Sequence, residues 1–229
     1  MTRAATAPSP VIIAASDARL SGDLRLPEHP RGLVVFAHGS GSSRHSARNV
    51  FVAESLGRHG LGSLLMDLLT PSEDVIDRQT AQWRFDVDLL GRRVGDVIDW
   101  LAKEPGLAHL PLGLFGASTG AAAALIAAAS HPGRVRAVVS RGGRPDLAGA
   151  ALARVTAPTL LLVGGLDDTV LALNTAAKTR LRGEVALEVV PGATHLFEEP
   201  GALEIVAESA AAWFSQHLTS AQPAPRHRT

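Results

Sequence analysis

The sequence of 229 residues contains no cysteine and no tyrosine, and aromatic residues make up only 4% of it. Without cysteine the chain can form no disulfide, use no thiolate nucleophile and hold no zinc through sulfur. So few aromatic side chains argue against the stacking surfaces used to bind single-stranded nucleic acids. Lysine plus arginine and aspartate plus glutamate both number 22, so the formal net charge is zero. No basic field is therefore expected to attract a nucleic acid.

Long uninterrupted apolar segments are also missing. The alanine-rich segment 121–129 is too short to span a bilayer. Residues 1–10 lack the apolar core of a secretory signal. We therefore expect a cytoplasmic protein without a membrane partner. Apolar residues nevertheless make up 46% of the chain, which is enough for a substantial core.

Hydrophobic patterning predicts a single α/β domain over residues 11–218. Segments 11–13 and 22–27 fit an antiparallel hairpin, after which apolar strands alternate with helices. The expected strands lie at 33–37, 61–67, 111–115, 135–140, 159–163 and 185–190, and the polar segment 68–82 is expected to be a surface excursion. Continuous apolar strands are typical of a mostly parallel sheet with helices on both faces. Residues 1–10 and 219–229 are expected to be a disordered N-terminus and a flexible tail.

The segment Gly116-Ala117-Ser118-Thr119-Gly120 follows one of these apolar strands and precedes an alanine-rich helix. It fits the pattern G-x-S-x-G, in which a serine lies on a sharp strand-to-helix turn. Small flanking residues allow the chain to fold back tightly there. The same pattern also fits a tight connection without a chemical role, so the motif needs support from the other strand ends.

Three other strands end in residues that could assist a serine. Strand 33–37 runs into His38 and a glycine-rich loop, strand 159–163 is followed by Asp167, and strand 185–190 by His195. A serine hydroxyl needs a base to take its proton, and a histidine base needs a carboxylate to fix its tautomer. The carboxyl ends of parallel strands meet at one edge of a sheet. The sequence therefore predicts a site built from Ser118, an acid and His195.

These motifs resemble the α/β-hydrolase superfamily, in which the triad runs serine, acid, histidine along the chain. The closest likeness is to its small, lidless dienelactone-hydrolase-like group. The resemblance covers residues 11–217 and rests on segments 38–42, 116–120, 164–170 and 192–195. It implies that Ser118 is the nucleophile, Asp167 the acid and His195 the base, with no cofactor and no metal. The namesake enzymes use a cysteine nucleophile, so an ordinary esterase is expected here.

Two aspartates compete for the acid role. The family pattern Gly-x-x-Asp-x-x-Val selects Asp167, which is followed by Val170. Asp168 is instead expected to cap the helix that follows.

An oxyanion hole requires two N–H donors aimed at the developing negative charge. One donor is expected to be the backbone N–H of Thr119, directly after the serine. The other is expected to be the N–H of Ser40 or Gly39. The loop that contains them fits neither a dinucleotide-binding nor a P-loop pattern. His38 is expected to order this loop through a hydrogen bond, with a catalytic role as the alternative.

Four residues are candidate substrate contacts, namely His38, His45, Arg141 and Arg144. Guanidinium groups bind carboxylates in bidentate geometry, so either arginine could bind a substrate carboxylate. A structural pair with Asp146 or a solvated loop is the favoured interpretation. The histidines show no metal-ligand spacing, so no metal is expected.

The predicted function is a serine hydrolase that cleaves small carboxylic esters, lactones or thioesters through an acyl-enzyme. The connection 140–159 is too short for a lid domain, so we expect a shallow site for small acyl groups. The expected partner is a small-molecule ester, and the chain is expected to be a monomer or homodimer. Two alternatives stay open: a non-catalytic ligand-binding module of the same fold, and an acyltransferase or perhydrolase that uses the same triad.

Overall fold

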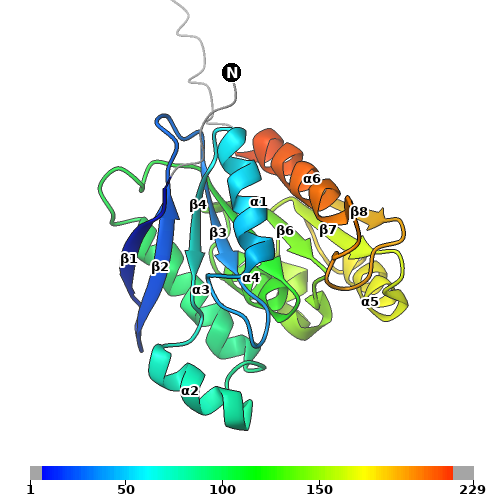
Figure 1. Ribbon diagram of the computed structural model, residues 1–229, viewed down its shortest axis with the longest axis horizontal. Coiled ribbons are helices and arrows are strands. Elements are labelled where there is room, and N and C mark those ends of the chain that lie inside the picture. Colours follow the sequence, from blue (N-terminus) through cyan, green and yellow to red (C-terminus); the bar gives the residue numbers. More distant parts are fainter. Residues whose placement is uncertain (1–6, 219–229) are drawn as a thin grey trace, which may run out of the picture.

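The computed structural model describes residues 7–218, which form a central sheet of eight strands between two layers of helices (Figure 1). The strands are β1 (Ser9–Ala14), β2 (Arg19–Arg25), β3 (Leu33–Ala37), β4 (Gly62–Met66), β5 (Leu112–Ala117), β6 (Val135–Arg141), β7 (Thr159–Gly164) and β8 (Val185–Val190). The helices are α1 (Ala47–Arg58), α2 (Pro71–Thr80), α3 (Val87–Leu101), α4 (Thr119–Ser130), the 3₁₀ segment η1 (Pro145–Arg154), α5 (Asp168–Lys178) and α6 (Ala202–His217).

The strands lie in the order β1-β2-β4-β3-β5-β6-β7-β8. Strand β1 pairs antiparallel with β2, and β2 pairs antiparallel with β4. All other neighbours are parallel. This arrangement confirms the predicted α/β fold, a mostly parallel sheet that begins with an antiparallel hairpin. It also brings the carboxyl ends of β3, β5, β6, β7 and β8 to one edge of the sheet.

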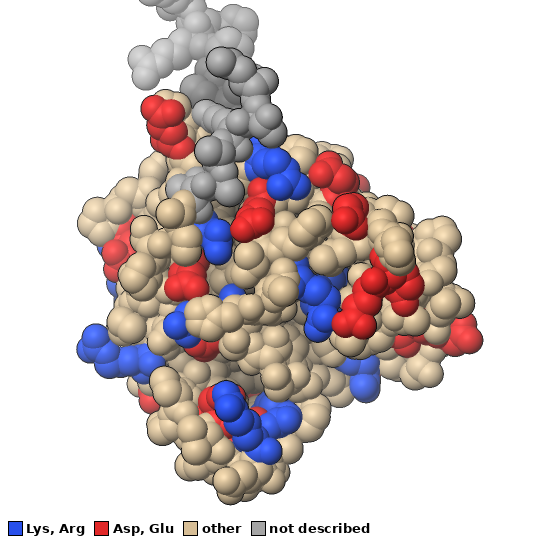
Figure 2. Space-filling view, viewed as in Figure 1, with Lys and Arg blue, Asp and Glu red and all other residues tan. Residues whose placement is uncertain are grey.

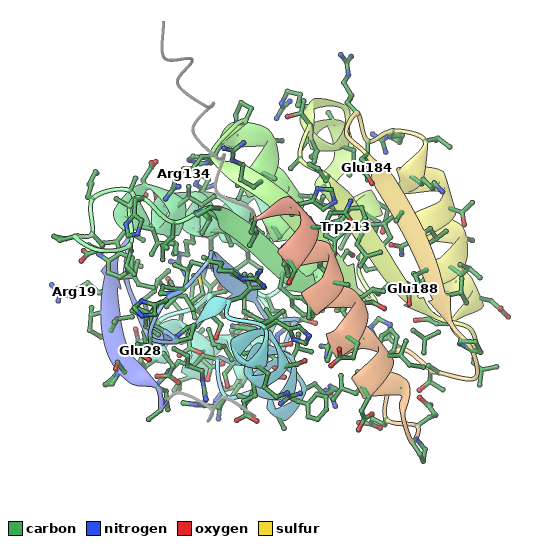
Figure 3. All side chains as sticks on the ribbon, turned by 90° about the horizontal axis from the view of Figure 1, so that it is seen from above. Arg19, Glu28, Arg134, Glu184, Glu188 and Trp213 are labelled. Carbon is green, nitrogen blue, oxygen red and sulfur yellow. The ribbon has the colours of Figure 1, made fainter. Side chains whose placement is uncertain are left out.

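The two faces of the sheet have separate apolar cores. One core lies beneath α1 and α6 and contains Phe36 and Phe115, whose ring centroids are 4.8 Å apart. The other lies beneath α3 and α4 and includes the alanines of α4. Figure 3 shows α6 crossing the sheet, with Glu188 of β8 beside it, and Ser209 of α6 donates a hydrogen bond to Glu188 at 2.7 Å. Within residues 7–218 no helix is long and apolar enough to cross a membrane.

The segment 68–82 lies largely at the surface, as expected, but it contains the ten-residue helix α2, which was not predicted. Its start has a capping box, in which Thr70 accepts from the N–H of Glu73 and Glu73 accepts from the N–H of Thr70. Pro71 occupies the first turn, where a missing N–H costs nothing. Only Asp77 of this helix is buried, so hydrophobic periodicity could not reveal it.

The expected domain start at residue 11 is also wrong, because β1 begins at Ser9. Ser9 pairs with Leu24 and Pro10 with Asp23, so the edge strand takes in two residues that were assigned to a disordered N-terminus. The rest of that expected N-terminus, apart from residues 7 and 8, and the expected tail at 219–229 lie outside the described residues.

Candidate active site

Ser118 lies on the sharp turn between β5 and α4, as the G-x-S-x-G pattern predicts. Its φ of 50° and ψ of −121° are strained values for a residue other than glycine. A Cβ at Gly116 would lie 2.4 Å from Cα of Ala121, and a Cβ at Gly120 would lie 2.3 Å from the carbonyl oxygen of Ala37. The chain can therefore make this turn at Ser118 only because Gly116 and Gly120 lack side chains.

Asp167 and His195 form a short hydrogen bond at the carboxyl ends of β7 and β8. His195 Nδ1 lies 2.6 Å from Asp167 Oδ2. The His195 side chain is 38% exposed and that of Asp167 only 15%. This contact fixes the tautomer of His195, because a carboxylate oxygen can only accept a hydrogen bond, so Nδ1 carries the proton. The Nε2 atom of neutral His195 is then left as a proton acceptor.

The same aspartate caps α5, since Asp167 Oδ1 accepts a hydrogen bond from the N–H of Val170 at 3.3 Å. The expectation that Asp168 caps this helix is therefore wrong. Asp168 is the exposed first residue of α5. The Asp167 side chain therefore has two contacts: it caps α5, and it is the carboxylate partner of His195.

The turn after β6 contacts both Ser118 and His195. The N–H of Ser118 donates to the carbonyl of Arg141 at 3.2 Å, and the N–H of Arg144 donates to the carbonyl of Ser118 at 3.1 Å. Gly142 has a φ of 51°, and a Cβ there would lie 3.6 Å from Cε1 of His195. In the described part of the chain, no hydrogen bond joins the Ser118 hydroxyl to His195. Catalytic hydrogen bonds often tighten only when substrate binds.

The loop after β3 lies against Ser118, because a Cβ at Gly39 would lie 3.2 Å from Cβ of the serine. The N–H of Ser40 donates to Thr119 Oγ1 at 2.9 Å. Sequence reasoning considered only the backbone N–H of Thr119, so the use of its hydroxyl was missed. No sequence pattern would have revealed this contact of the Thr119 hydroxyl.

His38 orders this loop from inside. Its Nδ1 lies 2.8 Å from the carbonyl oxygen of Gly39, and its Nε2 accepts from the N–H of Leu68 at 3.1 Å. Accepting at Nε2 requires the proton to sit on Nδ1, which then donates to Gly39. Burial lowers the pKa of His38, so its ring is neutral at pH 7. Both ring nitrogens are engaged, which leaves no nitrogen for a substrate contact.

A cavity of about 260 Å³ opens beside this loop and extends under α2. Its wall includes Gly39 and Ser40 together with His45, Asp74, Arg78 and Arg84. His45 has a 65% exposed side chain, and its Nδ1 lies 3.7 Å from Asp23. Figure 2 shows basic and acidic side chains side by side over α2, and Arg78 pairs there with Asp74 at 2.6 Å. The cavity wall therefore combines charged side chains of both signs with apolar ones such as Leu68 and Leu90.

The two arginines after β6 differ in their environment. Arg144 forms a bidentate pair with Asp146 at 2.9 and 2.8 Å, which is the structural pair favoured from the sequence. Arg141 is only 7% exposed and makes no side-chain hydrogen bond to any residue between 7 and 218. Its Nη1 is buried without a partner, so Arg141 differs from the paired Arg144. The described residues also contain no cluster of histidine and acidic side chains that could hold a metal.

Comparison with known proteins agrees with this architecture. The chain is 51% identical to the crystal structure of a dienelactone hydrolase from Anabaena variabilis, with a TM-score of 0.92 over 94% of this chain and 100% of that one. Est1E from Butyrivibrio proteoclasticus shares the fold at 17% identity, with a TM-score of 0.75 over 91% of this chain and 98% of that one. Fold and sheet topology place the chain in the α/β-hydrolase superfamily. The family model for the dienelactone hydrolase family matches residues 22–220, so the chain belongs to that family.

A curated relative from Mycobacterium tuberculosis (strain ATCC 25618 / H37Rv) is 58% identical over 213 residues. It is provisionally named a phosphoribosyl transferase. The match takes in 93% of this chain but only 47% of the relative, so the chain spans about half the length of that protein. The named relative therefore contains a large region that is not aligned with this chain. Family membership and the solved neighbours support a hydrolase.

Proposed function

We propose that this chain is a serine hydrolase of small carboxylic esters, with Ser118 as nucleophile, His195 as base and Asp167 as the acid that orients His195. The observation that carries the proposal is the 2.6 Å contact of His195 with Asp167 at the sheet edge that also holds the strained turn of Ser118. This turn exposes a serine at the end of β5 where a histidine with a fixed tautomer can take its proton. The fold, the family and the geometry all support this reaction class.

In the proposed reaction, His195 Nε2 takes the proton from the Ser118 hydroxyl as its oxygen attacks the ester carbonyl carbon. The carbonyl π electrons move to oxygen, and the resulting oxyanion accepts a hydrogen bond from the N–H of Thr119. When the tetrahedral intermediate collapses, the alkoxide leaves with the proton that His195 holds. An acyl group then remains on Ser118.

Water completes the cycle by the same steps. His195 takes a proton from water, the hydroxide attacks the acyl carbon, and Ser118 leaves with that proton as the acid product is released. Asp167 stabilises the charged form of His195 in both halves of the reaction. The second oxyanion donor is the N–H of Gly39 or of Ser40, and the latter would have to turn away from Thr119 Oγ1 or share its proton.

A fluorophosphonate probe tests the nucleophile directly. We expect the probe to label the folded wild type on the peptide that contains Ser118, and Ser118→Ala to remain unlabelled. Ser130→Ala is the matched control, because Ser130 is an exposed serine at the other end of α4. Labelling of folded Ser118→Ala at the wild-type rate would contradict the assignment, and a folded wild type that is not labelled would favour a non-catalytic module.

The substrate class is tested with p-nitrophenyl esters of increasing acyl length. We expect the highest kcat/KM on short acyl chains, because the cavity beside Ser40 has a volume of only about 260 Å³, and no activity in Ser118→Ala. Activity that peaks on long acyl chains would contradict the proposed substrate class. Product analysis with added alcohol or hydrogen peroxide separates hydrolysis from acyl transfer and perhydrolysis.

A further inference from the structure

The cavity beside Ser40 has a wall whose aspartates and arginines pair with one another. Three arginines and three aspartates line it, and together they form three ion pairs. The pairs are Arg44–Asp67, Arg78–Asp74 and Arg84–Asp77. Asp23 is not part of the lining, and its carboxylate contacts the basic side chains of Arg44 at 3.5 Å and His45 at 3.7 Å. Among the aspartates and arginines of the described wall, none lacks a counter-ion.

This pairing makes the cavity a poor site for a charged group. An ion that enters would lose part of its hydration, and no unpaired aspartate or arginine of the wall would compensate for that loss. Two pairs are shielded from solvent, because the exposed fractions are 25% for Arg44 and 18% for Asp67, and 22% for Arg84 and 2% for Asp77. Opening either pair to bind an ion would expose the other partner to the same cost. An uncharged group avoids both costs.

The wall also carries hydroxyl groups and apolar side chains. The hydroxyl groups belong to Ser40, Ser42 and Ser43, and the apolar side chains to Leu68, Leu69, Pro71 and Leu90. A hydroxyl can donate one hydrogen bond and accept others. A ligand that presents both C–H and O–H groups therefore suits this lining.

The ion pairs leave hydrogen-bonding groups unused. Arg84 donates to Asp77 through Nε and Nη2, and its Nη1 lies 3.6 Å from the position that a Cβ at Gly41 would take. Asp74 accepts from Arg78 through Oδ2, so Oδ1 is a further acceptor. The wall thus offers both donors and acceptors although its charges cancel.

The cavity begins at the proposed oxyanion hole. Gly39 and Ser40 line it. A Cβ at Gly39 would lie 3.2 Å from Cβ of Ser118, and the N–H of Ser40 donates to Thr119 Oγ1. An ester held at Ser118 can therefore extend one of its two ends into the cavity.

We propose that this cavity binds an uncharged, polyhydroxylated part of the substrate, so that the preferred esters carry a glycerol-like or sugar-like group beside the bond that is cleaved. This inference rests on the proposed function and names its substrate class. Neighbouring hydroxyls both donate and accept, as the wall does, and they bring no charge. The volume of about 260 Å³ is small for a ligand site, so it suits one such group rather than a chain of sugars.

Two pairs of esters test the hydroxyl preference and show which side of the ester carries it. For the alcohol side, 1-glyceryl monoacetate is compared with n-propyl acetate. For the acyl side, methyl 3,4-dihydroxybutanoate is compared with methyl butanoate. Each kcat/KM is divided by the rate constant for alkaline hydrolysis of that ester, so that differences in chemical reactivity cancel. We expect one hydroxylated ester to exceed its partner about tenfold, and the proposal is overturned if neither does.

The exposed pair of Asp74 and Arg78 tests whether the paired wall sets this preference. Charged esters are used on the side that carries it. They are 4-acetoxybutanoate and acetylcholine for the alcohol side, and monomethyl succinate and methyl 4-(trimethylammonio)butanoate for the acyl side. In wild type neither charged ester should exceed the uncharged ester without hydroxyls.

Removing one partner should shift selectivity towards the charge that the other partner attracts. Asp74→Asn leaves Arg78 unpaired, so kcat/KM for the anionic ester relative to the uncharged one should rise about two- to fivefold at low ionic strength. Arg78→Met should raise the ratio for the cationic ester by a similar factor, and the double variant should return both ratios to wild type. Asp88→Asn is the matched control, because Asp88 is exposed in the first turn of α3 and does not line the cavity. Unchanged ratios in both single variants would overturn the proposal.

A binding measurement separates failure of this proposal from failure of the proposed reaction. The four uncharged esters are titrated into Ser118→Ala, which lacks the proposed nucleophile, and backbone amide shifts are followed by NMR. Saturable shifts at Ser42 and Ser43, with a dissociation constant about tenfold lower for a hydroxylated ester than for its partner, support the cavity assignment even if wild type hydrolyses no ester. Equal affinities, or shifts confined to other residues, overturn it.

Discussion

The N–H of Ser40 and the side-chain oxygen of Thr119 are joined by a hydrogen bond of 2.9 Å, although the residues lie 79 positions apart. The Thr119 side chain thereby holds the loop after β3. In the proposed site, this loop and the N–H of Thr119 lie on opposite sides of the oxyanion. The loop is also held from below by His38, which contacts Gly39 and Leu68. The two sides of the proposed oxyanion hole are therefore fixed to one another before substrate arrives.

Thr119→Val removes the acceptor and keeps the shape of the side chain. We expect kcat/KM on a small aryl ester to fall about tenfold, because the donor loop loses its anchor and the N–H of Ser40 is left without a partner. Thr119→Ser, which restores the hydroxyl, should stay within about threefold of wild type. An increase in activity in Thr119→Val would instead mean that the hydroxyl competes with the oxyanion for the N–H of Ser40.

Replacing Asp167 by asparagine should lower kcat by about 10³- to 10⁴-fold, because the amide no longer fixes the tautomer of His195 or stabilises its charged form. Asp168→Asn is the natural comparison, because that neighbouring carboxylate is exposed and contacts neither residue of the pair. Equal losses in both variants would remove Asp167 from the acid role.

Asn174 links the acid helix to the turn after β6. Its side chain is fully buried, and its amide nitrogen donates to the carbonyls of Gly143 at 2.9 Å and Val170 at 2.8 Å. We expect Asn174→Ala to lower kcat about tenfold with little change in KM, because the turn that contacts Ser118 and His195 loses its support. Thr175→Ala, a change on the exposed side of the same helix, should leave kcat unchanged. A rise in KM at constant kcat would argue against a positioning role.

The ion pair of Glu73 with Arg93 should make folding stability sensitive to acid. Hydrogen bonds from buried Arg93 lower the pKa of Glu73 from 4.5 to about 2. A carboxyl whose folded pKa lies below its unfolded value stabilises fully above the unfolded value, and this contribution is lost as pH falls from 4.5 towards 2. Glu73→Gln should therefore lower the free energy of unfolding at pH 7 by about 1–3 kcal/mol. Its Tm should then change less than that of wild type between pH 5 and pH 2.

Glu204→Gln provides the comparison for this measurement, since Glu204 is an exposed carboxylate of α6. Its Tm curve should follow that of wild type at every pH. If Glu73→Gln and wild type lose stability in parallel between pH 5 and pH 2, the Glu73 pair contributes nothing to acid sensitivity.

The parallel strands were predictable because buried strands are continuous apolar runs that end in glycine-rich loops. Reactive side chains at strand ends then share a sheet edge whatever their distance in sequence, which is why an acid after β7 could be paired with His195 beforehand. The choice of Asp167 over Asp168 came from the resemblance to the family pattern. Helix α2 was missed because a polar helix on the surface has no apolar stripe, although its capping box was legible. Two features could not be predicted: Asp167 both caps α5 and contacts His195, and Nη1 of Arg141 is buried without a partner among the described residues. Both depend on the directions of side chains, which no sequence pattern encodes.

Helix α2 forms one wall of the cavity beside Ser40 and yet has only Asp77 in the interior. The part of this wall that α2 forms thus contributes few buried side chains to the packing around the sheet. Changes at the exposed Arg78, which lines the cavity, are therefore expected to alter which molecules fit at little cost to folding. The position 116–120 has no such freedom, because its glycines abut main-chain atoms. Substrate specificity can therefore change at α2 while segment 116–120, which the proposed chemistry requires, stays the same. Evolution or a designer would alter specificity at α2.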